Sequence, residues 1–210
     1  MTAAGSVAFA VLAVLVHSKW APLRTLDIDV ADDVNRYVAA HPVQVDIWRT
    51  VSAVGSPAVL RVAALGGAVL LWIWHRRRAA ALVIVTMLGA ALLGALAKTL
   101  VRRPRPVVPE PVAHVGDWSF PSSHALTSFV GMGLLLVVAL PGVRGVWRVA
   151  LVAAAGAVVA AVGFSRVALG VHYASDVAGG WVLGGTWLLA TVALLRRLER
   201  RSGAAAPADM

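Results

Sequence analysis

Apolar residues are gathered into long runs along this chain, and six of the runs have the character of membrane-spanning helices. A span needs roughly 17–25 mostly apolar residues. Several runs lie near the lower limit, and tryptophans at their ends can complete them at the membrane interface. The predicted spans are Thr2–Val16, Pro57–Trp74, Ala79–Ala97, Ala125–Leu140, Val149–Phe164 and Val177–Leu195. The pattern predicts an all-α integral membrane protein with six transmembrane helices in one bundle.

The segment between the first two spans, residues 17–56, is too polar to cross a membrane. It contains two apolar stripes with helical spacing: Val30, Val34 and Val38, then Ile47, Val51 and Val54. Acidic residues occupy the other side of the first stripe. The segment is therefore expected to form one or two amphipathic helices, which either lie on the membrane surface or pack against the bundle as a cap.

Composition supports a membrane protein and excludes several other classes. The chain is 60% hydrophobic and 14% charged, with a mean hydropathy of +0.81, whereas soluble domains are about half apolar and a quarter charged. Its net charge of +9 arises from basic residues at the ends of apolar runs, which argues against nucleic-acid binding. It has no cysteine, so disulfide and thiolate chemistry are excluded. We expect one domain over residues 1–201 and a disordered tail over residues 202–210.

Basic residues in the short loops predict the orientation in the membrane. Three clusters, at residues 75–78, 144–148 and 196–201, fall on one side if six spans alternate. Because cytoplasmic loops are rich in Lys and Arg, that side and both termini are expected to be cytoplasmic. No Lys or Arg precedes Lys19, so the first run lacks the basic region of a cleaved signal peptide and is interpreted as an uncleaved span.

Three short polar segments lie at the ends of apolar runs: Lys98–Pro106, Pro121–His124 and Ser165–Asp176. The predicted topology places all three on the extracytoplasmic face. Each has a simpler explanation when taken alone, namely a basic cluster that binds anionic lipid, a helix cap and a surface His–Asp pair. Together they supply the cations, hydroxyl groups and imidazoles that a phosphoryl-transfer site needs.

The spacing within the segments suggests a role for several residues. His172 and Asp176 are four residues apart, so on a helix they share a face. The carboxylate can then fix the tautomer of the ring and leave its second nitrogen free as a nucleophile. Ser122 or Ser123 is expected to cap the fourth span, with His124 in the first turn, where free N–H groups attract anions.

Three basic residues of these segments are expected where the backbone is restricted by proline or where a helix begins or ends. Lys98 follows the third span, and Pro104 and Pro106 restrict the backbone around Arg105. Arg166 is expected just before the helix of the His–Asp pair, where a planar guanidinium can grip phosphate oxygens.

In order and spacing, Lys-x6-Arg-Pro, Pro-Ser-x-His and Ser-Arg-x5-His-x3-Asp resemble the signature of the type 2 phosphatidic acid phosphatase superfamily. That family includes membrane lipid phosphatases and soluble vanadium haloperoxidases, and the predicted spans fit the membrane branch. The resemblance covers the catalytic core, about residues 56–195. The chain departs from the family at Ser123, where Gly is usual. Because Gly lets backbone approach a ligand more closely, we expect an effect on rate rather than on reaction type.

The resemblance implies a two-step phosphatase that needs no metal ion and no other cofactor. His172 is the implied nucleophile, Asp176 orients it, and His124 protonates the leaving oxygen and then activates water. The implied phosphate-binding residues are Lys98, Arg105, Ser122, Ser123 and Arg166.

Five nearby residues have no role in the resemblance: Arg102, Arg103, Glu110, His114 and Asp117. Contact with the substrate headgroup is left open for the two arginines. The other three could also touch the substrate, but a solvated loop is the preferred interpretation for them.

The predicted function is hydrolysis of a lipid phosphate or diphosphate on the extracytoplasmic face. Undecaprenyl diphosphate, phosphatidylglycerol phosphate and phosphatidic acid all fit a cationic site beside apolar walls, and vanadate or phosphate should inhibit. A lipid-linked phosphotransferase would use the same site. A small lipid transporter is disfavoured because the middles of the spans are nearly free of charge. Gly180 and Gly184 could form a homodimer seam, but packing inside the bundle is favoured.

Overall fold

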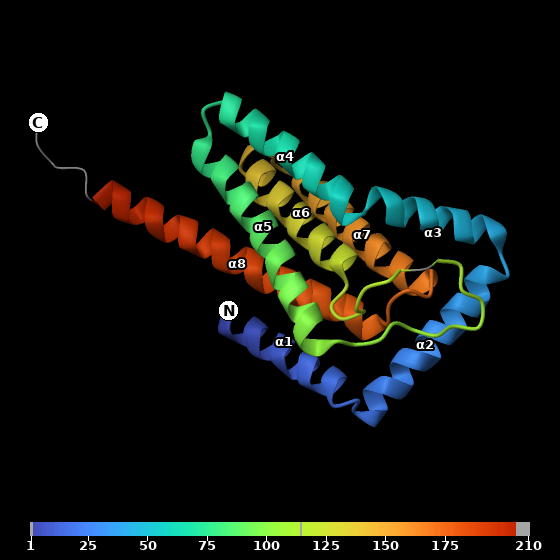
Figure 1. Ribbon diagram of the computed structural model, residues 1–210. Helices are drawn as coiled ribbons and strands as arrows, with labels where there is room; N and C mark the ends of the chain where they lie inside the picture. The colour runs from blue at the N-terminus through green and yellow to red at the C-terminus, as the bar shows by residue number, and fades with distance from the viewer. Residues whose placement is uncertain (1, 114, 205–210) are drawn as a thin grey trace, which may run out of the picture.

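The computed structural model describes residues 2–113 and 115–204, and within these residues every regular element is helical (Figure 1). The helices are α1 (Thr2–His17), α2 (Ala21–Ala39), α3 (Pro42–Val54), α4 (Pro57–Ile73), α5 (Arg77–Val101), α6 (Ser123–Ala139), α7 (Val146–Ala168) and α8 (Ala174–Ala204), with a short 3₁₀ turn at Leu140–Gly142. Helix α8 continues three residues into the predicted disordered tail, and residues 205–210 lie outside the described part of the chain.

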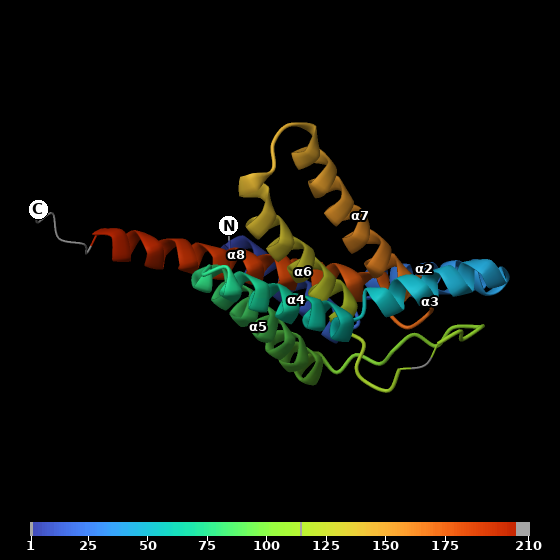
Figure 2. The same cartoon turned by 90° about the horizontal axis from the view of Figure 1, so that it is seen from above.

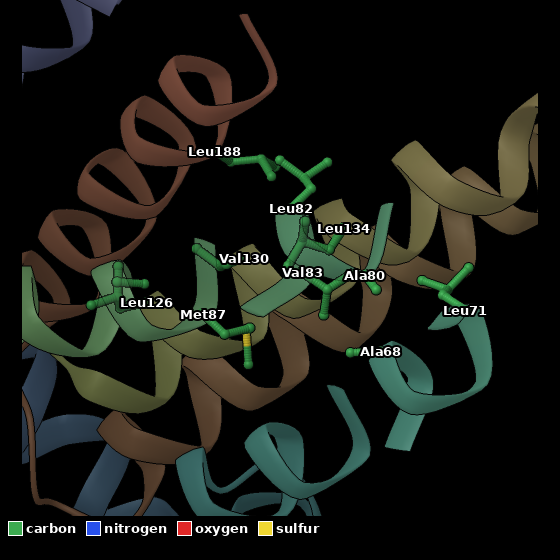
Figure 3. Close-up of a cluster of buried hydrophobic side chains, with 11 residues drawn as sticks. Ala68, Leu71, Ala80, Leu82, Val83, Met87, Leu126, Val130, Leu134 and Leu188 are labelled. Atoms are coloured by element: carbon green, nitrogen blue, oxygen red, sulfur yellow. The ribbon is translucent and has the colours of Figure 1, made fainter. Parts of the chain in front are cut away.

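Helix α6 is the centre of the bundle and packs against α4, α5, α7 and α8 (Figure 2). Its apolar side chains meet those of α5 and α8 in the main core, where Val130 contributes a fully buried side chain (Figure 3). Gly180 of α8 lies so close to α6 that an added Cβ would come within 2.7 Å of the Ser122 carbonyl oxygen. A Cβ at Gly184 would also meet α6. Packing inside the bundle is thus confirmed for this glycine pair.

The outer surface of the bundle is apolar, as a bilayer requires. Large aliphatic side chains such as Val62 and Leu92, each 71% exposed, face outward. Among the described residues, five helical stretches are long and apolar enough to cross a membrane, one of them being α3 and α4 together. A sixth is reached only if α1 and α2, which meet at a bend of 83°, form one broken span. The prediction of an all-α, multi-pass membrane fold is confirmed.

Helices α2 and α3 occupy the polar segment and pack against α7, so the capping interpretation describes them. The most buried stripe of α2 is not the valine stripe expected from the sequence. It consists of Asp27, Ala31, Asn35 and Val38, and Val38 packs against Ala168 at the end of α7. The stripe was hidden in the sequence because half of it is polar.

The cap also holds the long connection between α5 and α6, which crosses the end of the bundle (Figure 1). The Asn35 amide donates to the Glu110 carbonyl oxygen at 3.0 Å and accepts from the Glu110 N–H at 3.2 Å. Arg49 of α3 donates to the Val112 carbonyl oxygen at 2.8 Å. The connection between α5 and α6 is therefore held in place by hydrogen bonds from α2 and α3. It carries several residues of the site described next.

Candidate active site

The fold brings the three polar segments together at one end of the bundle, where α5 and α7 end and α6 and α8 begin (Figures 1 and 2). Direct contacts link all three. Arg105 of the first segment reaches His172 of the third, and the Ser122 N–H donates to the Asp176 carbonyl oxygen at 3.0 Å. Residues separated by more than 50 positions in the sequence thus share one site.

His172 lies in the turn before α8, and the expectation that it shares a helix face with Asp176 is wrong. Only Asp176 is on the helix, in its first turn. The carboxylate turns back toward the preceding residues, accepting from the Tyr173 N–H at 2.9 Å, as acidic side chains in a first helical turn commonly do. Its Oδ2 atom lies 3.4 Å from His172 Nδ1. The predicted pairing is therefore present, but a turn rather than a helix produces it.

The neighbours of the His172 ring determine its tautomer. Arg105 Nη1 lies 3.1 Å from Nε2, and because a guanidinium can only donate, Nε2 must be the acceptor. The proton of the neutral ring is then on Nδ1, which faces Asp176 Oδ2 and the Ser119 hydroxyl. The lone pair of Nε2 points to the cationic side of the site. This is the orientation that a nucleophilic imidazole requires.

Burial keeps the His172 ring neutral. The residue is 2% exposed, and this burial lowers its pKa to about 4, with Asp176 opposing the shift and Arg105 and Arg166 adding to it. The contact with Asp176 is thus a hydrogen bond from a neutral ring at neutral pH. A neutral ring has its nucleophilic lone pair available.

Asp176 is held by residues to which the sequence analysis gave no role. Arg103 donates to its Oδ1 at 2.7 Å, and the Ser119 hydroxyl donates to its Oδ2. A second Arg103 nitrogen donates to Asp27 of α2 at 2.7 Å, and the guanidinium stacks 4.0 Å from the Tyr173 ring centroid. The Arg103 side chain is 11% exposed, and its contacts within the described residues are structural. It ties the carboxylate to the cap.

The cationic side contains an unexpected carboxylate. Asp117 was interpreted as part of a solvated loop, yet it pairs with Lys98 Nζ at 2.8 Å and with the Arg105 guanidinium. Burial acts to raise its pKa, but hydrogen bonds from Lys98 and Arg105 outweigh this and lower the pKa to about 2. Its side chain is 55% exposed. Any phosphate that binds both cations must compete with this carboxylate.

Arg166 is the second guanidinium of the site, and it lies in the last turn of α7. It donates to the Ser52 hydroxyl of α3, a contact not foreseen from the sequence. Its Nε is buried and has no hydrogen-bond partner among the described residues. Arg105 and Arg166 also repel each other. A buried guanidinium donor without a partner, close to a second guanidinium, is suited to an anion.

Helix α6 begins at the site as predicted. Ser122 is its N-cap and accepts from the Ala125 N–H, and Ser123 and His124 occupy its first turn. His124 lies within electrostatic reach of Arg166, His172 and Arg105. Residue 123 has helical backbone, so Ser fits there without strain. The free N–H groups of this turn are an anion-binding feature.

Other nearby residues lie apart from this cluster. Arg102 is exposed and donates to the Thr99 carbonyl oxygen at 2.9 Å. Glu110 has an exposed side chain, and His114 lies outside the described residues. Among the side chains that the structure describes, no group of three or more His, Cys, Asp or Glu residues is arranged to hold a metal ion.

Comparison with known families agrees with the motif spacing. Residues 78–200, more than half of the chain, match the PAP2 superfamily. The chain belongs to this superfamily. The resemblance stated from the three motifs is thereby confirmed, and the match contains all of the predicted site residues.

Two curated relatives align with part of the chain. Phosphatidylglycerophosphatase B of Bacillus subtilis is 35% identical over 96 residues, which cover 44% of this chain and 46% of the relative. Undecaprenyl-diphosphatase of Sulfolobus acidocaldarius is 30% identical over 130 residues, which cover 58% of this chain and 57% of the relative. The aligned part is thus about half of each relative's length.

Two solved structures share the fold. A transmembrane PAP2-type phosphatidylglycerolphosphate phosphatase from Bacillus subtilis superposes with a TM-score of 0.80 at 20% identity, over 93% of this chain and 96% of the other. Aquifex aeolicus LpxE superposes with a TM-score of 0.64 at 21% identity, over 80% of this chain and 95% of the other. The membrane PAP2 fold therefore extends over nearly the whole chain.

Proposed function

We propose that this protein is a membrane lipid phosphatase that hydrolyses a lipid phosphate or diphosphate through a phosphohistidine on His172. One observation carries the proposal. The ring places its Nε2 lone pair beside Arg105 and its Nδ1 proton toward Asp176. The nucleophilic atom is thus directed at the group of cations that would hold a phosphate.

In the first step, Nε2 of His172 attacks phosphorus, an N–P bond forms, and the bond from phosphorus to the lipid oxygen breaks. His124 donates a proton to that oxygen, so the lipid leaves as a neutral alcohol or, from a diphosphate, as a lipid monophosphate. The ring becomes positively charged as it attacks, and the buried carboxylate of Asp176 stabilises this charge. Lys98, Arg105 and Arg166 stabilise the phosphoryl oxygens, which carry the remaining negative charge.

In the second step, His124 is neutral and accepts a proton from a water molecule that attacks phosphorus. The N–P bond breaks, inorganic phosphate forms, and His172 regains its lone pair. His124 is again protonated for the next cycle. Both steps need His124 on the open side of the phosphoryl group, opposite the attacking ring, and its place in the first turn of α6 is consistent with this.

The substrate class follows from the position of the site. The cations lie at the end of an apolar bundle whose outer surface suits lipid chains, so the phosphate of a membrane lipid can reach them without leaving the bilayer. Phosphatidylglycerol phosphate and undecaprenyl diphosphate are the leading candidates because they match the names of the aligned relatives, and phosphatidic acid is the third. The basic clusters lie at the opposite end of the bundle, which supports an extracytoplasmic site.

A panel of lipid phosphates tests this function. Purified protein in neutral detergent micelles is given each lipid, with EDTA present, and released phosphate is counted. We expect turnover of at least one lipid, and loss of at least about a thousandfold in His172→Ala. His75→Ala, at the opposite end of the bundle, is the matched control and should keep full activity. Release of phosphate by His172→Ala at the wild-type rate contradicts the proposal, as does a requirement for added divalent metal.

A further inference from the structure

A second basic cleft lies beside the catalytic site, at the junction of α1, α2 and the end of α5. Its volume is about 450 Å³, within the usual range for small-ligand sites. It is lined by His17, Lys19, Arg24, Arg102 and Arg103, with apolar side chains between them. No Asp or Glu is among its lining residues. We refer to it as the α1–α2 cleft.

Three of the cations in the α1–α2 cleft have no acidic partner. Lys19, Arg24 and Arg102 are exposed, and none of them takes part in the ion pairs found within the described residues. Arg103 differs, since Asp27 and Asp176 neutralise it. A concave site with several uncompensated positive charges attracts an anion.

Two of these cations occupy backbone positions that usually belong to glycine. Lys19 follows α1 with φ of 55°, and Arg102 ends α5 with φ of 48°. Left-handed residues at helix C-termini are commonly Gly, because other residues adopt this conformation at a cost in free energy. Here both positions carry basic side chains instead, and both line the same cleft.

The location of the cleft selects the class of anion. It lies where α1 and α5 end, and Trp20 lines it with half of its surface exposed, as tryptophans at a membrane interface commonly are. Val14 and Leu100, which precede the two basic termini, are 64% and 68% exposed and face outward along the apolar surface. A ligand with a phosphate in the cleft and acyl chains along α1 and α5 satisfies both features.

We infer that the α1–α2 cleft binds the phosphodiester headgroup of an anionic glycerophospholipid. The ligand is bound and not hydrolysed, because the cleft offers cations but no nucleophilic pair like His172 and Asp176. The inference does not depend on the proposed catalytic activity.

The inference is tested by lipid-dependent thermal stability in a neutral detergent. Short-chain phosphatidylglycerol is compared with phosphatidylcholine of the same chain length, and the rise in Tm is followed against lipid concentration. The cleft variant is Lys19→Gly with Arg24→Gln and Arg102→Gly, in which glycine suits the backbone at both left-handed positions. Arg76→Gln with Arg77→Gln and Arg78→Gln removes the same charge at the opposite end of the bundle.

We expect phosphatidylglycerol to raise the Tm of the wild type and of the control more than phosphatidylcholine does. In the cleft variant, the phosphatidylglycerol concentration for a half-maximal rise should increase about tenfold or more. An unchanged lipid response in the cleft variant overturns the inference. If the triple variant does not fold, the double variant Lys19→Gly with Arg102→Gly takes its place. Equal stabilisation by glycerophosphoglycerol, the same headgroup without acyl chains, would contradict a lipid ligand.

Discussion

The two sides of the catalytic site differ in how their charges are satisfied. On the side of the proposed nucleophile, Asp176 is fully buried and accepts from Arg103, Ser119, the Tyr173 N–H and His172. On the side of the cations, Lys98 and Arg105 share a half-exposed carboxylate, and Arg166 retains a buried donor that has no partner in the described part of the chain. One side is closed and internally complete, whereas the other has charge left for a ligand.

The difference corresponds to two tasks. A nucleophile must be held in one orientation before the substrate arrives, and a closed hydrogen-bonded network provides this. Phosphate must enter and leave in every cycle, so its site needs partners that can be exchanged. Changes on the nucleophile side should therefore reduce kcat, and changes on the cation side should alter affinity.

The largest effect is expected for Asp176→Asn, which keeps the shape of the side chain and removes its charge. The amide can no longer hold the Nδ1–H tautomer of His172 or stabilise the charged ring, so kcat should fall by about a thousandfold or more with little change in KM. Steady-state kinetics with the best lipid substrate measures both values. A large rise in KM at unchanged kcat would contradict the division between the two sides.

A smaller effect is expected for Asp27→Asn, because Asp27 does not contact Asp176 directly. It acts through Arg103 and through the N–H and hydroxyl of Ser175, which precedes Asp176 in the chain. Loss of the Asp27 charge weakens its hydrogen bonds with Arg103 and Ser175 and should lower kcat by about tenfold. Without the Asp27 charge, Arg103 disfavours protonation of His172 more strongly, so the acidic limb of the kcat–pH profile should move to lower pH.

Asp33→Asn is the matched control for Asp27→Asn, since Asp33 lies on the same helix in an exposed pair with Arg36. Its kinetics should equal those of the wild type. If Asp27→Asn lowers the Tm but leaves the kcat–pH profile unchanged, Asp27 has only a structural role and the prediction is contradicted.

On the cation side, Asp117→Asn should strengthen the binding of phosphate-like anions. The carboxylate competes with phosphate for Lys98 and Arg105, and because its side chain is half-exposed, the gain should be that of a surface ion pair, roughly fivefold. Inhibition constants for vanadate and phosphate measure the change. Weaker inhibition in this variant would show that Asp117 supports the anion site instead of competing for it.

The smallest effect concerns stability and pH. Burial lowers the pKa of native His172 to about 4, whereas the unfolded residue titrates near its ordinary value of about 6.5. Between these values the unfolded state binds the additional proton, so stability falls as the pH decreases. From pH 7.5 to 5.5 this residue should cost about 1 kcal/mol. The Tm should therefore fall less in His172→Asn than in the wild type, and equal falls would contradict a neutral buried ring.

The sequence was sufficient for the all-helical, multi-pass fold and for the motif residues, because both depend on local patterns. The first two predicted spans were less well defined, since within the described residues α1 qualifies only together with α2, and α4 only together with α3. Hydrophobic runs predict membrane helices directly, and the motif spacing identified His172 with its partner Asp176. The turn that carries His172 was not foreseen, because spacing alone does not reveal where a helix begins.

The supporting residues were missed because long-range docking creates their roles. Arg103 and Asp27 are 76 positions apart, and Arg166 and Ser52 are 114 apart. One signal was present in α2, where Asp27, Ala31 and Asn35 recur every fourth residue. A search for apolar stripes alone misses this one, because two of its members, Asp27 and Asn35, are polar side chains that are buried to form hydrogen bonds.

The most direct test of the central claim is to trap the phosphoenzyme in His124→Ala, which retains the nucleophile but cannot activate water efficiently. The variant is mixed with a lipid diphosphate, whose phosphate leaving group needs little protonation, and is quenched at alkaline pH, where phosphohistidine persists. Peptide mass spectrometry then locates the phosphoryl group. We expect it on His172 and expect none in the double variant with His172→Ala. Phosphate on another residue, or equal labelling of the double variant, would contradict His172 as the nucleophile.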